Sequence, residues 1–247
     1  MAKQGGMGDA LYVSGYDFSG DITAIGSIAG GLDPRECTSI IKYGMERIGG
    51  RKSGSIVATS WFDSAAGAAH DRYSTLPTVD QLVSYKHTTV LGGPSADLLA
   101  KQTNYDGERN DDGDLTFEVE ALSSAGYPLE WGRQLTAGKR TDSSAANGTG
   151  VDFGASSAFG IAVYMHVFAF TGTSVTVKIQ ESSDNAVGDA YADVVGAGFM
   201  AATAITFQRI QTATDLSVER WLRVVTTGTF TNAVFAVSVM RYLTAVT

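Results

Sequence analysis

The chain has 247 residues, and 44% of them are hydrophobic, which suits one large all-β domain or two domains of ordinary size. Its net charge of −8 argues against wrapping around DNA, because that mode of binding needs clustered Lys and Arg to neutralise phosphates. The single cysteine, Cys37, excludes an internal disulfide and a cysteine-based metal cluster, and a buried or inert thiol is the favoured interpretation.

The 29 glycines against 4 prolines predict many turns and bulges rather than a disordered chain. The N-terminal residues contain no apolar stretch of signal-peptide length. The longest apolar stretch, 159–170, has twelve residues and is too short to span a bilayer. We therefore expect a soluble protein made in a reducing compartment, without membrane insertion.

The first half is predicted to be mostly β with two short helices. Good helix formers at 65–76, with Asp63 or Ser64 as N-cap, predict the first helix. Pro94 precedes the second, which is expected at 95–102. Strands or alternating apolar stretches are expected at 11–14, 21–28, 55–63 and 115–121.

The stretch 115–121 alternates apolar and polar residues, which predicts a strand with one buried face. Its outward face carries Thr116, Glu118 and Glu120. A row of carboxylates on such a face repels a phosphate backbone, so it would give DNA no place to bind. An ordinary solvated strand face has the same pattern, and the sequence leaves both interpretations open.

Two further stretches of the first half are rich in charge. Residues 42–54 contain four glycines and the basic side chains Lys42, Arg47, Arg51 and Lys52, which predicts a long mobile loop or hairpin. Residues 106–114 contain five carboxylates within nine positions. A calcium loop of the EF-hand type fails there because its twelfth position falls on Val119. A solvated acidic turn is therefore favoured over a metal site.

A change of composition near residue 140 indicates a domain boundary. Residues 1–149 hold 13 Lys or Arg and 19 Asp or Glu, whereas residues 150–247 hold 5 and 7. The segment 141–150 is small and polar throughout, as a linker or long loop would be. We therefore expect one domain at 1–140, a linker at 141–150 and a second domain at 151–247.

The second half shows the clearer strand pattern. Turn signals at 171–173, 183–185 and 227–229 separate its apolar, alternating stretches. Short strands with turns at such intervals predict an antiparallel β-sandwich of jelly-roll type. The expected strands are 160–170, 174–180, 218–226 and 230–242.

The motifs of an enzyme are absent. The chain has neither a phosphate-binding loop nor a serine in Gly-x-Ser-x-Gly. Its histidines are scattered, and His166 lies within an apolar strand, where a satisfied core histidine is favoured over a ligand or base. We expect no catalytic residue, cofactor or metal. A carboxylate pair such as Glu118 and Glu130 leaves a glycosidase formally open.

The order of elements from Leu11 to Gly132 resembles the major tail proteins, or tail tube proteins, of long-tailed bacteriophages. The resemblance is one of spacing and order rather than of an invariant signature. The pieces that carry it are Ser60-Trp-Phe-Asp63, Gly92-Gly-Pro-Ser-Ala96, Asp112-Gly-Asp-Leu115 and Glu130-Trp-Gly132.

The resemblance implies a tail-tube β-sandwich or barrel domain with short flanking helices, followed by the jelly-roll-like sandwich. Such proteins stack as rings, usually hexameric, whose inner sheets join into a barrel around a DNA channel. It further implies the flanking helix at 65–76 and a loop to the next ring at 42–54, with Lys42, Arg47, Arg51 and Lys52. Thr116, Glu118 and Glu120 would line the channel.

The partners implied are copies of the chain itself, other tail proteins such as the tape measure and the tail terminator, and DNA in transit. The implied location is the virion tail, assembled in the cytoplasm of the host bacterium. Two alternatives stay open, a capsid decoration protein and a host-surface carbohydrate-binding protein. The second would need exposed aromatic side chains, for which Tyr191 and Tyr242 are loose candidates, whereas Trp221 is expected in the core.

Overall fold

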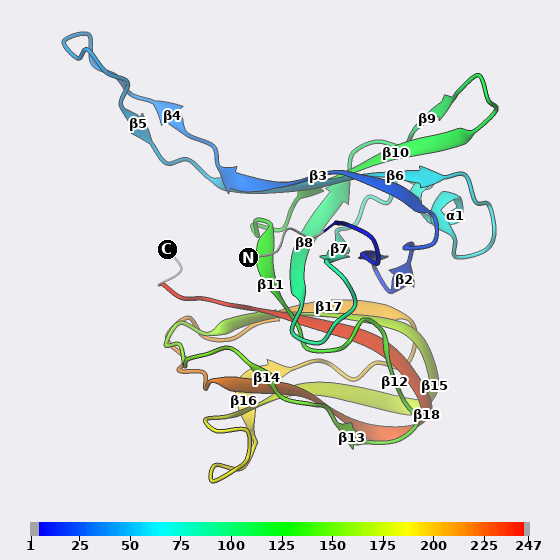
Figure 1. Cartoon of the computed structure of the whole chain (residues 1–247), viewed down its shortest axis with the longest axis vertical. Helices are drawn as coiled ribbons and strands as arrows, with labels where there is room; N and C mark the ends of the chain where they lie inside the picture. Colours follow the sequence, from blue (N-terminus) through cyan, green and yellow to red (C-terminus); the bar gives the residue numbers. More distant parts are fainter. Residues whose placement is uncertain (1–4, 245–247) are drawn as a thin grey trace. The chain divides into compact units, whose positions relative to one another are not determined.

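The computed structural model describes residues 5–244 and is mainly antiparallel β-structure, which confirms the predicted fold class (Figure 1). Its contacts group the chain into two compact units. Among the described residues, unit 1 comprises 5–19, 84–97 and 131–244, and unit 2 comprises 20–83 and 98–130. No helix within residues 5–244 is long and apolar enough to cross a membrane.

Unit 1 is built around two very long strands that pair with each other along their whole length. Its strands are β1 (Ala10–Val13), β2 (Tyr16–Asp17), β12 (Arg140–Asp142), β13 (Ala146–Asn147), β14 (Val151–Asp152), β15 (Ile161–Ser182), β16 (Ala192–Gly198), β17 (Thr206–Gln211) and β18 (Trp221–Arg241). Three strands run through segments of both units: β7 (Gln81–Lys86), β8 (Pro94–Gln102) and β11 (Glu130–Gln134).

Glycines bend the two long strands where the sequence predicts turns. Gly172 in β15 and Gly228 in β18 have φ of 147° and 121°, and the register shifts on both sides of Gly172. A Cβ at Gly172 would lie 2.4 Å from the Cα of Phe230, so only glycine permits this approach of the two backbones. The predicted turn at 171–173 is therefore a bulge inside a continuous strand. The predicted turn at 227–229 is also part of a continuous strand and keeps a regular register with residues 174–176.

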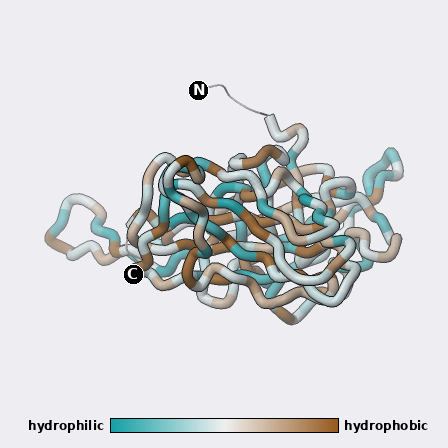
Figure 2. The backbone as a smooth tube through the Cα atoms, turned by 90° about the horizontal axis from the view of Figure 1, so that it is seen from below, coloured by the Kyte–Doolittle hydropathy of each residue, from teal (hydrophilic) through white to brown (hydrophobic). Residues whose placement is uncertain are grey.

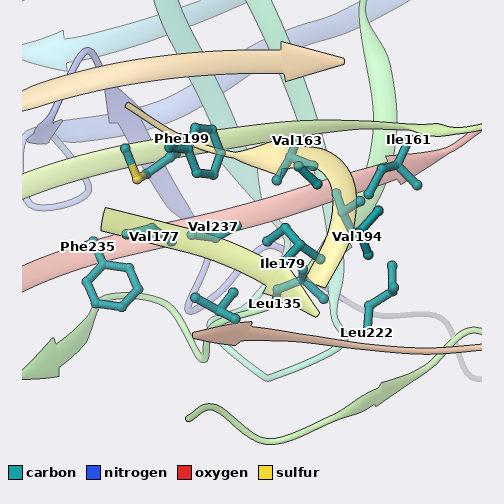
Figure 3. Packing of buried hydrophobic residues seen from close by; sticks show 14 of the residues in the cluster. Leu135, Ile161, Val163, Val177, Ile179, Val194, Phe199, Leu222, Phe235 and Val237 are labelled. Carbon is teal, nitrogen blue, oxygen red and sulfur yellow. The ribbon is translucent and has the colours of Figure 1, made fainter. Parts of the chain in front are cut away.

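The core of unit 1 consists of aliphatic and aromatic side chains from β15, β16 and β18. Figure 3 shows them pointing toward one another, with Phe199 and Leu135 from the adjoining loops. Ile161, Val163, Ile179, Leu222 and Phe235 are fully buried. Burial of side chains of this size stabilises by roughly 1.5–3 kcal/mol each.

Unit 2 contains a twisted antiparallel sheet in which β6 pairs with β3 on one side and β10 on the other. Beyond β10 lie β9, next to its first half, and the end of β8, next to its second half. Its elements are β3 (Ile22–Leu32), β4 (Arg35–Glu36), β5 (Arg47–Ile48), β6 (Lys52–Trp61), α1 (Ala69–Tyr73), β9 (Asp106–Arg109) and β10 (Leu115–Ser123).

The helix predictions need correction. The helix expected at 65–76 is reduced to α1, because Gly67 and Leu76 both adopt positive φ and delimit it. The helix expected at 95–102 is wrong, since these residues belong to β8. Ala96 and Leu98 on one face of the strand are buried, and so are Ser95 and Asp97 on the other face. Burial of both faces of a strand outweighs the helix propensity of Ala, Leu and Lys.

The structure divides the chain at other positions than the predicted segments 1–140, 141–150 and 151–247. Within 141–150, β12 and β13 pair with β18, and the Asp142 side chain is buried. The Arg140 guanidinium binds both carboxylate oxygens of Asp142, at 2.8 and 2.9 Å. The small, polar composition of the segment thus reflects a sheet edge in unit 1. Independent folding of 151–247 stays a prediction.

Candidate assembly surface

One face of the unit 2 sheet carries the three outward residues predicted for β10. Residues directly opposite each other on paired strands point to the same face of a sheet. The register places Glu108 opposite Thr116 and Asp106 opposite Glu118. This surface, here called the open face, therefore brings together Asp106, Glu108, Thr116, Glu118 and Glu120.

The opposite face of the same strands explains this orientation. Ile56 and Ala58 of β6 and Val119 and Ala121 of β10 are 2–6% exposed and pack inward. Because side chains alternate along a strand, burying these residues turns the polar residues between them outward. The same register places further residues of β6 and β3 on this face: Ser53, Ser55, Val57, Thr59 and Trp61, and Ala24, Ser27, Ala29 and Gly31. Most of these side chains are small or carry hydroxyls, whereas Val57 and Trp61 are bulky and apolar.

The electrostatics of the open face are dominated by its carboxylates. Glu118 is exposed, and Glu120 Oε2 accepts a hydrogen bond of 2.9 Å from Thr103 Oγ1. Lys101 lies opposite Leu122 on this face, but its ammonium is 3.0 Å from the carboxylate of Asp80. A hydrogen bond from Ser124, followed by one from Lys101, lowers the pKa of Asp80. The Lys101 charge is thus already compensated.

The two edges of the unit 2 sheet are open. Within the described residues β3 pairs only with β6, and β9 pairs only with β10. β3 is eleven residues long, mostly exposed, and contains neither a charged residue nor proline. Monomeric proteins usually protect such an edge with charges, prolines or bulges. β3 has two register shifts but none of the charged or proline protections, so it is suited to pairing with another chain.

Between β3 and β6 the chain forms a long hairpin, residues 33–51, which we call the arm and which contains β4 and β5 (Figure 1). Its apolar side chains are uncovered: Ile40 and Tyr43 are fully exposed, and Ile41 is 79% exposed. Figure 2 shows apolar and polar segments next to each other along it. Exposed apolar area of this kind is typical of a surface that binds a partner.

The four predicted basic residues of the loop all lie on the arm or at its base and are exposed: Lys42, Arg47, Arg51 and Lys52. Lys42 forms an ion pair with Glu46 at 3.0 Å. The favoured interpretation of the sequence for Cys37 is a buried or inert thiol, but Cys37 is exposed on the arm, so burial is wrong. The hairpin has no second layer to cover the thiol.

Unit 1 contains a buried polar network that includes a serine, a histidine and an aspartate. These are the residue types of a nucleophilic triad, but their arrangement differs. Asp97 accepts hydrogen bonds from Ser84, from Lys86 at 2.9 Å and from Ser238 at 2.8 Å, and His166 Nε2 lies 2.9 Å from Ser84 Oγ. In a nucleophilic triad the carboxylate orients the histidine. Here it binds the serine instead, and all five residues are at most 1% exposed.

The ionisation states in this network follow from burial. Burial is the main cause that lowers the pKa of the Lys86 ammonium, against the opposing effect of Asp97. Burial, and after it the Lys86 charge, holds the pKa of His166 well below its ordinary value. The Gly15 N–H donates to His166 Nδ1 at 3.2 Å, so the neutral ring carries its proton on Nε2 and donates to Ser84. The network is a structural tie between strands.

The residues considered for sugar binding are not free platforms. The Arg223 guanidinium lies 4.0 Å from the centre of the Tyr191 ring, and Tyr191 Oη donates to Asn185 at 2.8 Å. Tyr242 is 9% exposed. As for a carboxylate pair, Glu130 is buried whereas Glu118 is exposed on the open face. No observation in the described residues favours a carbohydrate-binding protein or a glycosidase.

Asp106 and Glu108 are functional candidates that the sequence analysis assigned to a solvated turn. Asp106-Gly107-Glu108 alternates with a period of two, and Asn110 to Asp114 closes the hairpin with Gly113 at φ 92°. Alternation before a glycine-containing turn was the signal for a β-hairpin. A hairpin at this position brings Glu108 opposite Thr116 and Asp106 opposite Glu118.

Comparison with known proteins finds likeness to solved structures alone. No protein-family model matches the sequence, and no curated protein matches it. A chain from the virion of a native gene transfer agent particle is 16% identical, with a TM-score of 0.39, over 51% of this chain and 98% of that chain. A chain from the tail of an empty particle of this kind, with C6 symmetry, is 18% identical, with a TM-score of 0.33, over 50% and 96%.

A third similar structure is the Dit protein of phage SPP1, described as a hub adsorption apparatus. It is 9% identical, with a TM-score of 0.33, over 95% of this chain and 99% of that chain. The first two structures come from a virion and a tail, and the third from a phage adsorption apparatus.

Proposed function

We propose that the chain is a structural protein of a phage tail and that unit 2 assembles into stacked rings around a DNA channel. The open face is the observation that supports this proposal most directly. It gathers Asp106, Glu108, Glu118 and Glu120 on one surface, among mostly small or hydroxyl-bearing side chains and the apolar Val57, Trp61 and Leu122. Lining a channel, these carboxylates repel the phosphate backbone and leave DNA free to slide.

The sheet edges provide the means of closing a ring. In this proposal β3 of one copy pairs with β9 of the next, a head-to-tail contact that repeats until the ring closes. Both strands then gain the backbone partners that they lack in a single copy. Six copies per ring, and contacts with tape measure and tail terminator proteins after assembly in the host cytoplasm, are carried over from the family resemblance.

Electron microscopy of the purified full-length protein tests the proposal. We expect hollow tubes or stacked rings of uniform width, because an uncharged eleven-residue edge favours pairing between copies. A capsid decoration protein or a host-recognition module gives no such tubes. Particles that stay monomeric across the accessible range of protein concentration and salt would rule out tube assembly.

A charge reversal tests the channel. Replacing Glu118 and Glu120 with Lys is expected to leave tube assembly intact and to slow DNA ejection, because each phosphate then meets an attractive site. The measurement is the rate of DNA release from virions that carry the variant chain. The matched control is Glu118→Gln with Glu120→Gln, which removes the repulsion without adding attraction and should eject faster than the Lys variant. Equal ejection rates for all three proteins would contradict a channel position for this face.

A further inference from the structure

The sheet of unit 2 has two chemically different ends. At one end Leu32 pairs with Lys52, and the arm continues beyond this pair. At the other end Trp61 pairs with Thr116, and the turn between β9 and β10 extends beyond that pair (Figure 1). β6 runs from one end to the other over ten residues, so the ends are about 30 Å apart.

The arm end combines apolar side chains with a small excess of basic residues. The arm carries four basic and three acidic residues, and Glu36 lies opposite Arg47 in the register of β4 and β5. Ile40, Ile41 and Tyr43 are exposed near the tip. Arg47 and Arg51 are exposed and form no ion pair within residues 5–244. The arm end therefore exposes apolar side chains to water, together with two guanidinium groups that form no ion pair within residues 5–244.

The opposite end of the sheet, which we call the acidic end, carries exposed aromatic side chains and negative charges. Trp61 and Phe62 are 43% and 42% exposed there. The adjacent turn carries Asp111, Asp112 and Asp114, which are exposed and have no ion pair within the described part of the chain. Figure 2 shows this turn as a hydrophilic segment on the side of the molecule away from the arm.

We propose that the arm of one copy docks on the acidic end of the next copy, with its apolar tip against Trp61 and Phe62 and its arginines against the aspartates. This inference rests on the proposed function and names the surface that receives the arm. Because donor and acceptor lie at opposite ends of one sheet, the contact is head-to-tail and repeats along an axis. The charges orient the approach, and the exclusion of water from apolar side chains supplies most of the affinity.

Charge exchange tests this pairing. The arm variant replaces Arg47 and Arg51 with Glu, and the end variant replaces Asp111 and Asp112 with Lys. Each variant alone places like charges opposite one another, and we expect the protein concentration needed for polymerisation to rise roughly tenfold or more. The quadruple variant restores opposite charges between the four exchanged positions and is expected to recover polymerisation. An equimolar mixture of the two double variants should also polymerise, with arms of each docking on the other.

Sedimentation velocity and electron microscopy provide the readout, and Asp215→Lys, an exposed reversal in unit 1, is the matched control expected to polymerise normally. Circular dichroism checks that every variant is folded. Normal polymerisation of both double variants would overturn this pairing and leave the proposed tube intact. The pairing would also be overturned if both double variants fail to polymerise and the quadruple variant fails as well. A wild-type protein that never associates would overturn the proposed function and this inference with it.

Discussion

Replacing Asp97 with alanine is expected to destabilise the fold by about 3–5 kcal/mol, because it leaves a buried ammonium without its counter-ion. Lys86 is 1% exposed, and its Nζ lies 2.9 Å from Asp97 Oδ1 and 2.7 Å from Ser238 Oγ. Removing the carboxylate also takes away the acceptor of the Ser84 and Ser238 hydroxyls. The measurement is the free energy of unfolding from denaturant titrations followed by circular dichroism.

The control for this prediction removes both charges. Lys86→Met combined with Asp97→Leu eliminates the unpaired ion, so the double variant is expected to be clearly more stable than Asp97→Ala alone. A substitution that merely disturbs packing gives the opposite order, because the double variant changes two buried side chains. Equal stability of Asp97→Ala and the wild type would show that water or another group compensates Lys86.

The strands of this fold were predictable where a single face is buried. β10 alternates between inward apolar and outward polar residues, so its pattern predicts both the strand and the direction of Glu118. β8 is buried on both faces and loses this alternation, and its Ala, Leu and Lys residues then resemble a helix. At Gly172 the sequence shows the glycine but not the partner backbone at Phe230 that makes it a bend inside a strand.

The sequence predicts which residues share the open face only where those residues belong to one strand. Thr116, Glu118 and Glu120 share a face because of the period of two. Asp106 and Glu108 join them only through the register between β9 and β10, which depends on the hairpin turn. The same applies to Lys86 and Ser238, which are 152 positions apart in the chain and meet through strand pairing. Sequence patterns report local periodicity and contain no direct record of such long-range pairing.

Acidification is expected to destabilise the fold through His166. Burial, and after it the Lys86 charge, holds the pKa of this histidine well below its ordinary value of 6.5, so the folded protein keeps the ring neutral. Protonation would place a second donor at Nδ1 against the Gly15 N–H. The unfolded chain binds the proton near pH 6.5, and stability therefore falls as the pH drops below that value. The loss is about 1.4 kcal/mol per pH unit until the folded pKa is reached.

The free energy of unfolding measured between pH 7.5 and 4.5 is expected to decrease below about pH 6.5 because of this group. His166→Gln lowers stability at pH 7.5 but removes that part of the pH dependence, because the amide does not titrate. His87→Gln is the matched control: His87 pairs with Asp9 at 3.0 Å and is not part of the bond to Gly15, so this variant keeps the His166 contribution. If His166→Gln loses stability with acid as steeply as the wild type, the acid sensitivity belongs to other groups, since the buried imidazole is then absent.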